Sequence, residues 1–245
     1  MRNTEFLLVQ YNEPRSMELF NKFYTEIYCT DFIDPDEQED LESFHQYLLN
    51  NNSGNQNNNY RVVLLLESNL VIGCAIFDYL PLSNCGIIEY IVIKDSYRRR
   101  GFGKLLLEKI ECFLDSCATE RGQSNVEWIF AEVNNPWVTD RSKESSDPTA
   151  RLLYWRQMGF SHLDFPYCQP ALIEGKQPVL NLLFIGNGVQ PKPAIPSQIL
   201  NTAVIEYLMA DGWLSNPEKD VSVKEMLNWL LRNEYVYTKD LANFM

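Results

Sequence analysis

YIVIKDSYRRRGFGKLLLEKIECFL, residues 90–114, joins an apolar strand pattern, a basic glycine loop and an amphipathic helix pattern. The loop from Arg98 to Lys104 holds four basic residues in seven positions, in a chain whose formal net charge is -12. Glycines let a ligand approach the backbone closely. The free N–H groups and the dipole of the helix that follows attract an anion. The stretch therefore predicts a phosphate-binding loop at the start of a helix.

Three other interpretations of the glycine loop are weaker. A dinucleotide fingerprint needs a third glycine inside a parallel βαβ unit, whereas the pattern before this loop predicts antiparallel strands. The nucleotide motif GxxxxGK[ST] is absent from the sequence. A solvated helix start is the ordinary meaning of an isolated charge run, but the order of the elements around the loop argues against it.

The pattern around the loop predicts one α/β unit. Three strands with short connections, at 60–67, 70–79 and 86–93, predict an antiparallel meander before it. A nearly continuous apolar run at 126–133 predicts a buried strand after the helix at 101–119. Further patterns predict strands at 6–11 and 179–185 and helices at 16–29, 34–50 and 149–158. We expect a mixed, mostly antiparallel central sheet with flanking helices.

The chain divides into three segments by its pattern. Residues 1–188 form the predicted α/β domain. The proline-rich residues 189–196 predict a stiff linker, and helical spacing beyond them predicts a helical C-terminal extension at 197–245. These helices need a surface to pack on, which is the main domain, a partner or a second copy of the chain.

The composition excludes several classes of function. The acidic charge argues against nucleic-acid binding, because no broad basic surface is available to replace phosphate counterions. No signal peptide or membrane-length apolar run is present, so we expect a cytoplasmic protein with no membrane contact. With two histidines and six scattered cysteines lacking a CxxC pair, we expect neither a metal site nor disulfides.

Three segments carry a common pattern: the strand Glu89 to Ile93, the loop Arg98 to Gly103 and the helix with its Gly-Phe end, Ala150 to Phe160. Together they resemble the GNAT family of acyl-CoA N-acyltransferases. The resemblance covers residues 1–188. A further segment, Phe165 to Leu172, contains a Y-x-Q-P-x-L motif similar to that of one bacterial branch of the family.

The resemblance implies acetyl-CoA as the co-substrate. Its pyrophosphate would bind the backbone amides of the glycine loop, and its pantetheine arm would lie along the preceding strand, with Asn134 or Asn135 hydrogen-bonded to it. The implied cofactor-binding residues are Ile91, Val92, Ile93, Arg98, Arg99, Arg100, Gly101, Phe102, Gly103, Lys104 and Asn134.

Acetyl transfer to an amine needs a base and an oxyanion donor, and often an acid for the departing thiolate. Glu89 interrupts an apolar strand beside the expected thioester and is the leading candidate base, although a strand carboxylate facing solvent or paired with an arginine would look the same. Glu132 on the facing strand is the alternative. The resemblance assigns the oxyanion donor to the N–H of Ile91 or Val92.

The candidate acid departs from the family pattern. Where the family has a tyrosine four residues before the glycine, this chain has Trp155, and Tyr154 precedes it. A shift of one residue turns a helical side chain by about 100°, so Tyr154 cannot simply take the role of the family's tyrosine. Either Tyr154 or another tyrosine protonates the thiolate from a different direction, or the thiolate leaves unaided.

The resulting hypothesis is an N-acetyltransferase that moves acetyl directly from acetyl-CoA to a primary amine of a small molecule or peptide. The alternative is a non-catalytic acyl-CoA sensor or protein-interaction module, whose C-terminal helices bind a partner or form a homodimer.

Overall fold

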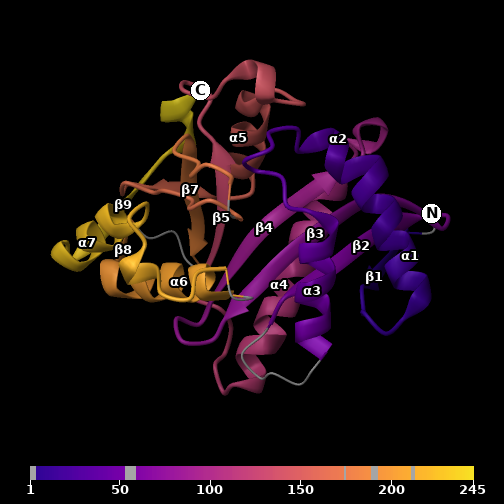
Figure 1. Ribbon diagram of the computed structural model, residues 1–245, viewed down its shortest axis with the longest axis horizontal. Coiled ribbons are helices and arrows are strands. Elements are labelled where there is room, and N and C mark those ends of the chain that lie inside the picture. The colour runs from indigo at the N-terminus through magenta and orange to yellow at the C-terminus, as the bar shows by residue number, and fades with distance from the viewer. Residues whose placement is uncertain (1–3, 53–58, 174, 189–192, 211–212) are drawn as a thin grey trace.

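The computed structural model describes residues 4–52, 59–173, 175–188, 193–210 and 213–245, and its centre is a nine-stranded sheet (Figure 1). The strand order is β1-β2-β3-β4-β5-β7-β6-β9-β8. All neighbouring strands are antiparallel except β4 and β5, which are parallel. The mixed, mostly antiparallel prediction is confirmed. The strands are β1 (Thr4–Leu8), β2 (Arg61–Glu67), β3 (Leu70–Leu80), β4 (Cys85–Ile93), β5 (Trp128–Asn134), β6 (Ser161–Leu163), β7 (Leu182–Gly188), β8 (Ala194–Pro196) and β9 (Tyr235–Lys239).

Helices cover both faces of the sheet. On one face lie α1 (Pro14–Phe23), a π-helical turn (Tyr24–Tyr28), α2 (Cys29–Asp31) and α3 (Leu41–Asn52), and on the other lie α4 (Phe102–Glu120) and α5 (Pro148–Gln157). Single 3-10 turns span Asp95–Tyr97, Arg141–Lys143, Pro217–Lys219 and Leu241–Phe244. No helix in the described part of the chain has the length and hydropathy that crossing a membrane requires.

Helix α4 is held against the sheet by its apolar stripe. Leu106, Leu107, Ile110, Leu114 and Ala118 are buried on it, and each large aliphatic side chain contributes about 1.5–3 kcal/mol relative to exposure. The stripe fixes the first turn of α4, and with it the glycine loop, beside the end of β4.

Strands β4 and β5 separate halfway along their length. They pair only from Cys85 with Trp128 to Ile88 with Ala131, yet β4 continues to Ile93 and β5 to Asn134. Beyond Ile88 the edge of β4 that faces β5 therefore has no partner strand. This gap in the sheet is the feature that positions the site.

A β-bulge in β4 lies where the gap begins. Phe77 of β3 pairs with Ile88 and Ile76 pairs with Tyr90, so Glu89 is the extra residue of the bulge. In a regular strand, residues two apart share a face. Here Ile88 packs on the α4 side and Tyr90 on the α1–α3 side, because the bulge changes the direction of the side chains.

The loop before α3 differs from its helical prediction. The predicted helix at 34–50 begins only at Leu41, where the Asp40 carboxylate accepts from the N–H of Ser43 at 2.8 Å. Before it, the N–H groups of Glu37 and Gln38 donate to the Asp34 carbonyl at 3.1 and 3.0 Å in a turn. Asp34 therefore closes a turn rather than starting a helix, and the acidic residues after it lie in a loop beside the gap.

The C-terminal extension contains the helices α6 (Ser197–Met209) and α7 (Lys224–Arg232), together with β9, a strand that its pattern did not predict. In the proline-rich segment, residues 189–192 lie outside the described residues, and Ala194–Pro196 forms β8. Strand β9 pairs with β6 and so continues the main sheet. Both helices pack in one apolar cluster with Trp128 and Phe130 of β5. The division of the chain into separate domains stays a prediction.

Candidate active site

The gap between β4 and β5 opens into a cleft of about 710 Å³. The cleft runs along β4 from Ile88 to Ile93, past the glycine loop and against α5. Of the residues predicted to hold the cofactor, all except Arg100 line it: Ile91, Val92, Ile93, Arg98, Arg99, Gly101, Phe102, Gly103, Lys104 and Asn134.

Backbone conformation gives the loop its shape. Arg99 and Gly101 both have positive φ, 60° and 86°, and Gly101 directly precedes the first turn of α4. The first N–H groups of a helix have no partners within the helix, so this turn directs hydrogen-bond donors and the positive end of its dipole toward the cleft. The arrangement suits an anion.

Two of the loop arginines have structural partners. Arg98 forms an ion pair with Asp31 of α2, and its Nε donates to the Ile93 carbonyl at 2.8 Å. Arg100 donates to the Ser96 carbonyl at 2.7 Å and lies 5.1 Å from the ring centre of Tyr97.

Arg100 does not line the cleft itself but covers Tyr97, which does, so its role in cofactor binding stays a prediction. Arg98 borders the cleft but is engaged in holding the loop to α2. Arg99 and Lys104 are the loop cations that line the cleft and do not form an ion pair with the 31–39 loop.

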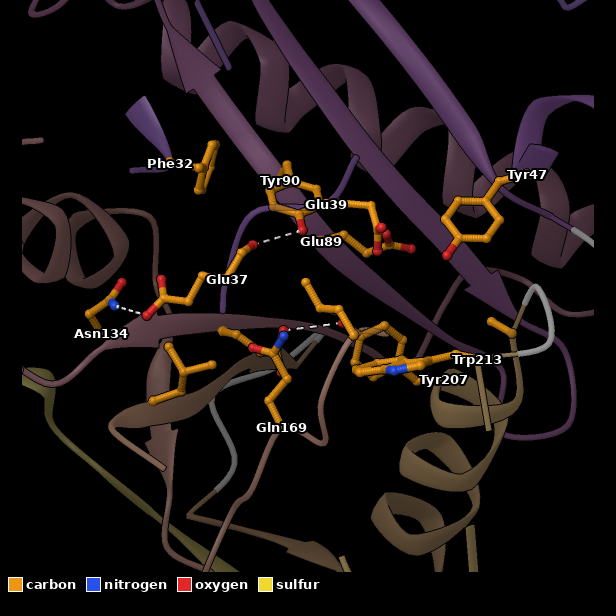
Figure 2. Close-up of a pocket in the computed structure, with 14 residues that line it drawn as sticks. Phe32, Glu37, Glu39, Tyr47, Glu89, Tyr90, Asn134, Gln169, Tyr207 and Trp213 are labelled. Atoms are coloured by element: carbon orange, nitrogen blue, oxygen red, sulfur yellow. Dashed lines mark hydrogen bonds between the residues drawn. The ribbon is translucent and has the colours of Figure 1, made fainter. Parts of the chain in front are cut away.

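A smaller pocket of about 90 Å³ lies on the other side of the gap (Figure 2). Six residues line both cavities, which therefore meet in the gap: Phe32, Glu37, Glu89, Tyr90, Glu132 and Asn134. Eight further residues line the small pocket alone: Glu39, Tyr47, Gln169, Leu172, Leu182, Tyr207, Ala210 and Trp213.

Glu132 stands on β5 at this junction. Alternation along the strand puts it on the same face as Trp128 and Phe130, which pack against the extension. Its carboxylate accepts hydrogen bonds from the hydroxyls of Tyr167 and Tyr207, the latter at 3.1 Å. Burial raises the pKa of Glu132 to about 7, and the two tyrosine donors act in the opposite direction. At neutral pH this group is close to half ionised.

Glu89 lies across the gap from Glu132. The bulge lets it enter the small pocket together with its neighbour Tyr90, and Figure 2 shows its carboxylate directed toward that of Glu39. Both predicted candidate bases thus lie where the two cavities meet.

Two carboxylates of the site were not predicted. Glu37 accepts from the amide of Asn134 at 2.7 Å, while Arg151 donates to the same amide's oxygen at 3.2 Å. Glu39 is 4% exposed and accepts from the N–H of Asp40 at 3.1 Å. Burial raises the pKa of both glutamates. The prediction of a helix at 34–50 concealed the role of these two glutamates, although the dense acidic run before α3 could have indicated a carboxylate-lined site.

Tyr154 lies against the cofactor cleft, whereas Trp155, at the family's tyrosine position, is 5% exposed in the core. A Cβ on Gly103 would lie 3.1 Å from Cε2 and 3.3 Å from the hydroxyl of Tyr154. The hydroxyl has no hydrogen-bond partner within the described residues. Burial raises the pKa of Tyr154 above its usual 10, so it stays protonated.

The extension and the Y-x-Q-P-x-L segment build the outer wall of the small pocket. Tyr207 comes from α6, and the indole N–H of Trp213 donates to the Ala171 carbonyl at 3.0 Å. Within the segment, Tyr167 bonds to Glu132 as described, and Gln169 and Leu172 line the pocket. No pattern in the extension predicted this contribution.

Comparison with known proteins points to the GNAT acetyltransferases. Residues 21–138, which include the glycine loop and both candidate bases, match the model of the acetyltransferase (GNAT) family. The matched part is 118 of the 245 residues, just under half of the chain. No curated protein sequence matches it.

Solved structures share the fold at low sequence identity. A protein of Bacteroides thetaiotaomicron assigned to the GNAT acetyltransferases has 18% identity and a TM-score of 0.58, over 85% of this chain and 98% of that one. One from Desulfovibrio desulfuricans has 15% identity and a TM-score of 0.51, over 77% and 100%. A GNAT acetyltransferase from Elizabethkingia anophelis with acetyl-CoA bound has 14% identity and a TM-score of 0.44, over 76% and 99%.

Proposed function

We propose that this protein transfers the acetyl group of acetyl-CoA directly to a primary amine. The observation that carries the proposal is the junction of two cavities at Glu89 and Glu132, inside the gap between β4 and β5. The larger cavity has an anion-binding loop at one end, as a nucleotide cofactor requires. The smaller one is lined by carboxylates, which suit an amine.

The cofactor is proposed to bind through the backbone of both the loop and β4. The N–H groups of the first turn of α4 receive the pyrophosphate, with Arg99 and Lys104 as the neighbouring cations. Because the edge of β4 that faces β5 has no partner strand beyond Ile88, the backbone groups on that edge can pair with the pantetheine amides in the way a neighbouring strand would. This places the thioester near Glu132.

Glu132 is proposed to take the proton from the acceptor ammonium. A base works best when its pKa lies near the working pH, and the pKa of Glu132 is about 7. The neutral amine then attacks the thioester carbonyl, so that a C–N bond forms and the C–S bond breaks. Glu89 remains the alternative base.

Two further groups complete the proposed mechanism. The N–H of Ile91 or Val92, on the open edge of β4, donates to the oxyanion of the tetrahedral intermediate. The protonated hydroxyl of Tyr154 donates a hydrogen bond to the departing thiolate, which needs no stronger acid because it is already a good leaving group.

Glu132→Gln and Glu89→Gln test the proposal, with calorimetry for acetyl-CoA affinity and a thiol-release assay against a panel of amines. We expect Glu132→Gln to lower turnover by about 10²–10⁴ while acetyl-CoA affinity stays within about twofold. An unchanged rate across pH would exclude Glu132 as the base, and loss of the acidic limb in Glu89→Gln would assign that role to Glu89. Acetyl-CoA binding without thiol release for any amine would refute the proposed transfer and favour a non-catalytic binding module.

A further inference from the structure

Gln169, in the Y-x-Q-P-x-L segment, is held in a fixed place on the wall of the small pocket. Its N–H and carbonyl pair with Val179 at 3.1 and 2.8 Å in an isolated β-bridge. The segment is also tied down on either side, because the Tyr167 hydroxyl donates to the candidate base and the Ala171 carbonyl accepts from the indole of Trp213. The side chain of Gln169 therefore extends from a backbone that is fixed at three points.

The side-chain amide of Gln169 faces the pocket and is not used within the protein. The residue is 6% exposed and lines the small pocket, and Figure 2 shows its side chain between Asn134 and Tyr207. The amide forms no hydrogen bond with any residue that the structure describes. The other neutral polar side chains of the pocket all have partners: Tyr47, Tyr90, Asn134, Tyr207 and Trp213.

A buried amide needs hydrogen-bond partners, because buried polar side chains are nearly always bonded. The amide of Gln169 offers two N–H donors and one carbonyl acceptor. A ligand group with an acceptor and a donor side by side satisfies more of it than a group with only one of them. Another amide has that arrangement, since its C=O and N–H can face the N–H and C=O of Gln169 in a pair of hydrogen bonds.

The lining of the pocket disfavours a carboxylate in place of the ligand amide. A carboxylate only accepts hydrogen bonds, and burying its charge without a counter-ion is costly. Among the described residues, no lysine or arginine lines the pocket. This holds whichever pocket glutamates are protonated, because a neutral glutamate supplies no positive charge either. An uncharged amide avoids the cost.

The reacting end and the amide end of such a ligand must lie close together. Glu132 and Gln169 line the same cavity. At about 10–15 Å³ for each enclosed water, its 90 Å³ holds roughly six to nine waters. A ligand of that size that reaches both residues has its amine and its amide only a few bonds apart.

We propose that Gln169 determines acceptor specificity and that the acceptor is an α-amino amide, in which one carbon separates the reacting amine from the amide. The inference rests on the proposed acetyl transfer at Glu132 for the reacting end and on the pocket alone for the amide end. Two sources carry this chemistry, a free amino-acid amide and the first residue of a peptide.

The test uses three amines with the same skeleton of non-hydrogen atoms. Glycinamide carries the amide, glycine has a carboxylate in its place, and 2-methylpropylamine has two methyl groups there. Each is titrated calorimetrically into the full chain at pH 6.5, where all three amines are protonated, with coenzyme A present. Each is also assayed separately as an acceptor with acetyl-CoA.

Two matched variants are compared with the wild type. Gln169→Met removes the amide and keeps the length of the side chain. Gln177→Met is the control, because Gln177 is exposed in the same region of the chain and lies outside the pocket. Circular dichroism checks the fold of both variants.

We expect glycinamide to bind the wild type about tenfold or more tightly than 2-methylpropylamine, as two additional hydrogen bonds imply, and more tightly than glycine. Gln169→Met should reduce the preference for the amide to within about twofold and raise KM for glycinamide alone, whereas Gln177→Met should preserve both. Loss of all three amines to the same extent would indicate a structural role for Gln169 and overturn the inference.

Three results in folded protein would also overturn it. Equal binding of glycinamide and 2-methylpropylamine by the wild type would show that water alone satisfies Gln169. A preference that survives Gln169→Met would place the amide elsewhere. Binding of glycine as tight as that of glycinamide would show that a carboxylate is accepted.

Glycylglycinamide distinguishes the two sources of the α-amino amide. Binding at least as tight as that of glycinamide would support a peptide N-terminus, and its exclusion would support a free amino-acid amide.

Failure of the wider proposal has a different result. Thiol release with the three amines at similar kcat/KM would overturn the amide specificity and leave acetyl transfer in place. Gln169-dependent binding of glycinamide without thiol release would support the amide site and refute acetyl transfer.

Discussion

Replacing Tyr207 with phenylalanine removes one of the two hydroxyl donors to Glu132 and leaves the aromatic ring in its cluster. The hydroxyl stabilises the ionised carboxylate, so its loss raises the pKa of Glu132 above about 7. A hydrogen bond to a charged group is worth about 1.5–3 kcal/mol, which equals roughly 1–2 pKa units at 1.36 kcal/mol per unit. The ionised fraction at pH 7 then falls from about one half to roughly 0.01–0.1, a decrease of about five- to fiftyfold.

The pH dependence of kcat/KM measures this shift directly. We expect the acidic limb of Tyr207→Phe to move upward by about 1–2 pH units, with most of the rate recovered at high pH. Ionisation of the acceptor amine contributes equally to both proteins, so the difference between the two profiles isolates Glu132. A limb at the wild-type position, with a uniform loss of rate at every pH, would refute the reasoning and leave Tyr207 a packing role.

Three further predictions concern the loop, the extension and the buried carboxylate. Gly103→Ala should weaken acetyl-CoA binding, measured by calorimetry, because its methyl group would displace Tyr154, 3.1 Å away; unchanged affinity would show that the ring can move freely. Glu206→Ala removes the acceptor of two N–H groups and one hydroxyl in the β3–β4 turn. The helix α6 should stay packed through its apolar face, but the unfolding free energy should fall by about 1.5–3 kcal/mol, and an unchanged denaturation midpoint would contradict this anchoring. Burial raises the pKa of Glu132 from 4.5 to about 7, so its contribution to stability is complete below pH 4.5 and is lost as the pH rises through about 7. Glu132→Gln should therefore stabilise the protein relative to wild type at pH 8.5 but not at pH 5. An equal difference in unfolding free energy at both pH values would exclude a raised pKa.

The sheet was largely predictable because its strands carry strong local patterns. The apolar runs that predicted strands at 60–67, 70–79 and 86–93 match β2, β3 and β4 within a residue or two. The helix stripe placed α4 correctly as well. Strand β9 was not predicted, although Tyr235–Lys239 is rich in the aromatic and β-branched residues that strands favour. The helical spacing elsewhere in the extension concealed it, and its place in the sheet depends on pairing with β6 and β8.

Within the site, the sequence predicted only those ionisable residues that also interrupt an apolar strand pattern. Glu89 and Glu132 stood out as charges inside apolar strands, and the structure brings both to the gap. Their directions did not follow from the sequence, since the bulge that turns Glu89 depends on the register with β3. Glu39 and Tyr207 were not predicted. Glu39 lies in a loop whose sequence resembles a helix start, and Tyr207 lies in a helix far along the chain, so both reach the pocket only through tertiary packing.

The hydrogen bond between Glu132 and Tyr207 also has a consequence for synthesis, since 75 residues separate its two ends. At about 5–20 residues per second, the ribosome adds Tyr207 roughly 4–15 s after Glu132. At the start of that interval the nascent chain holds β4 and the glycine loop, but it lacks α5, which lines the cleft, and both tyrosine donors to Glu132. The lining of the cleft is complete at Met158, whereas the small pocket also needs Tyr207 and Trp213, so synthesis supplies the walls of the cleft before those of the small pocket.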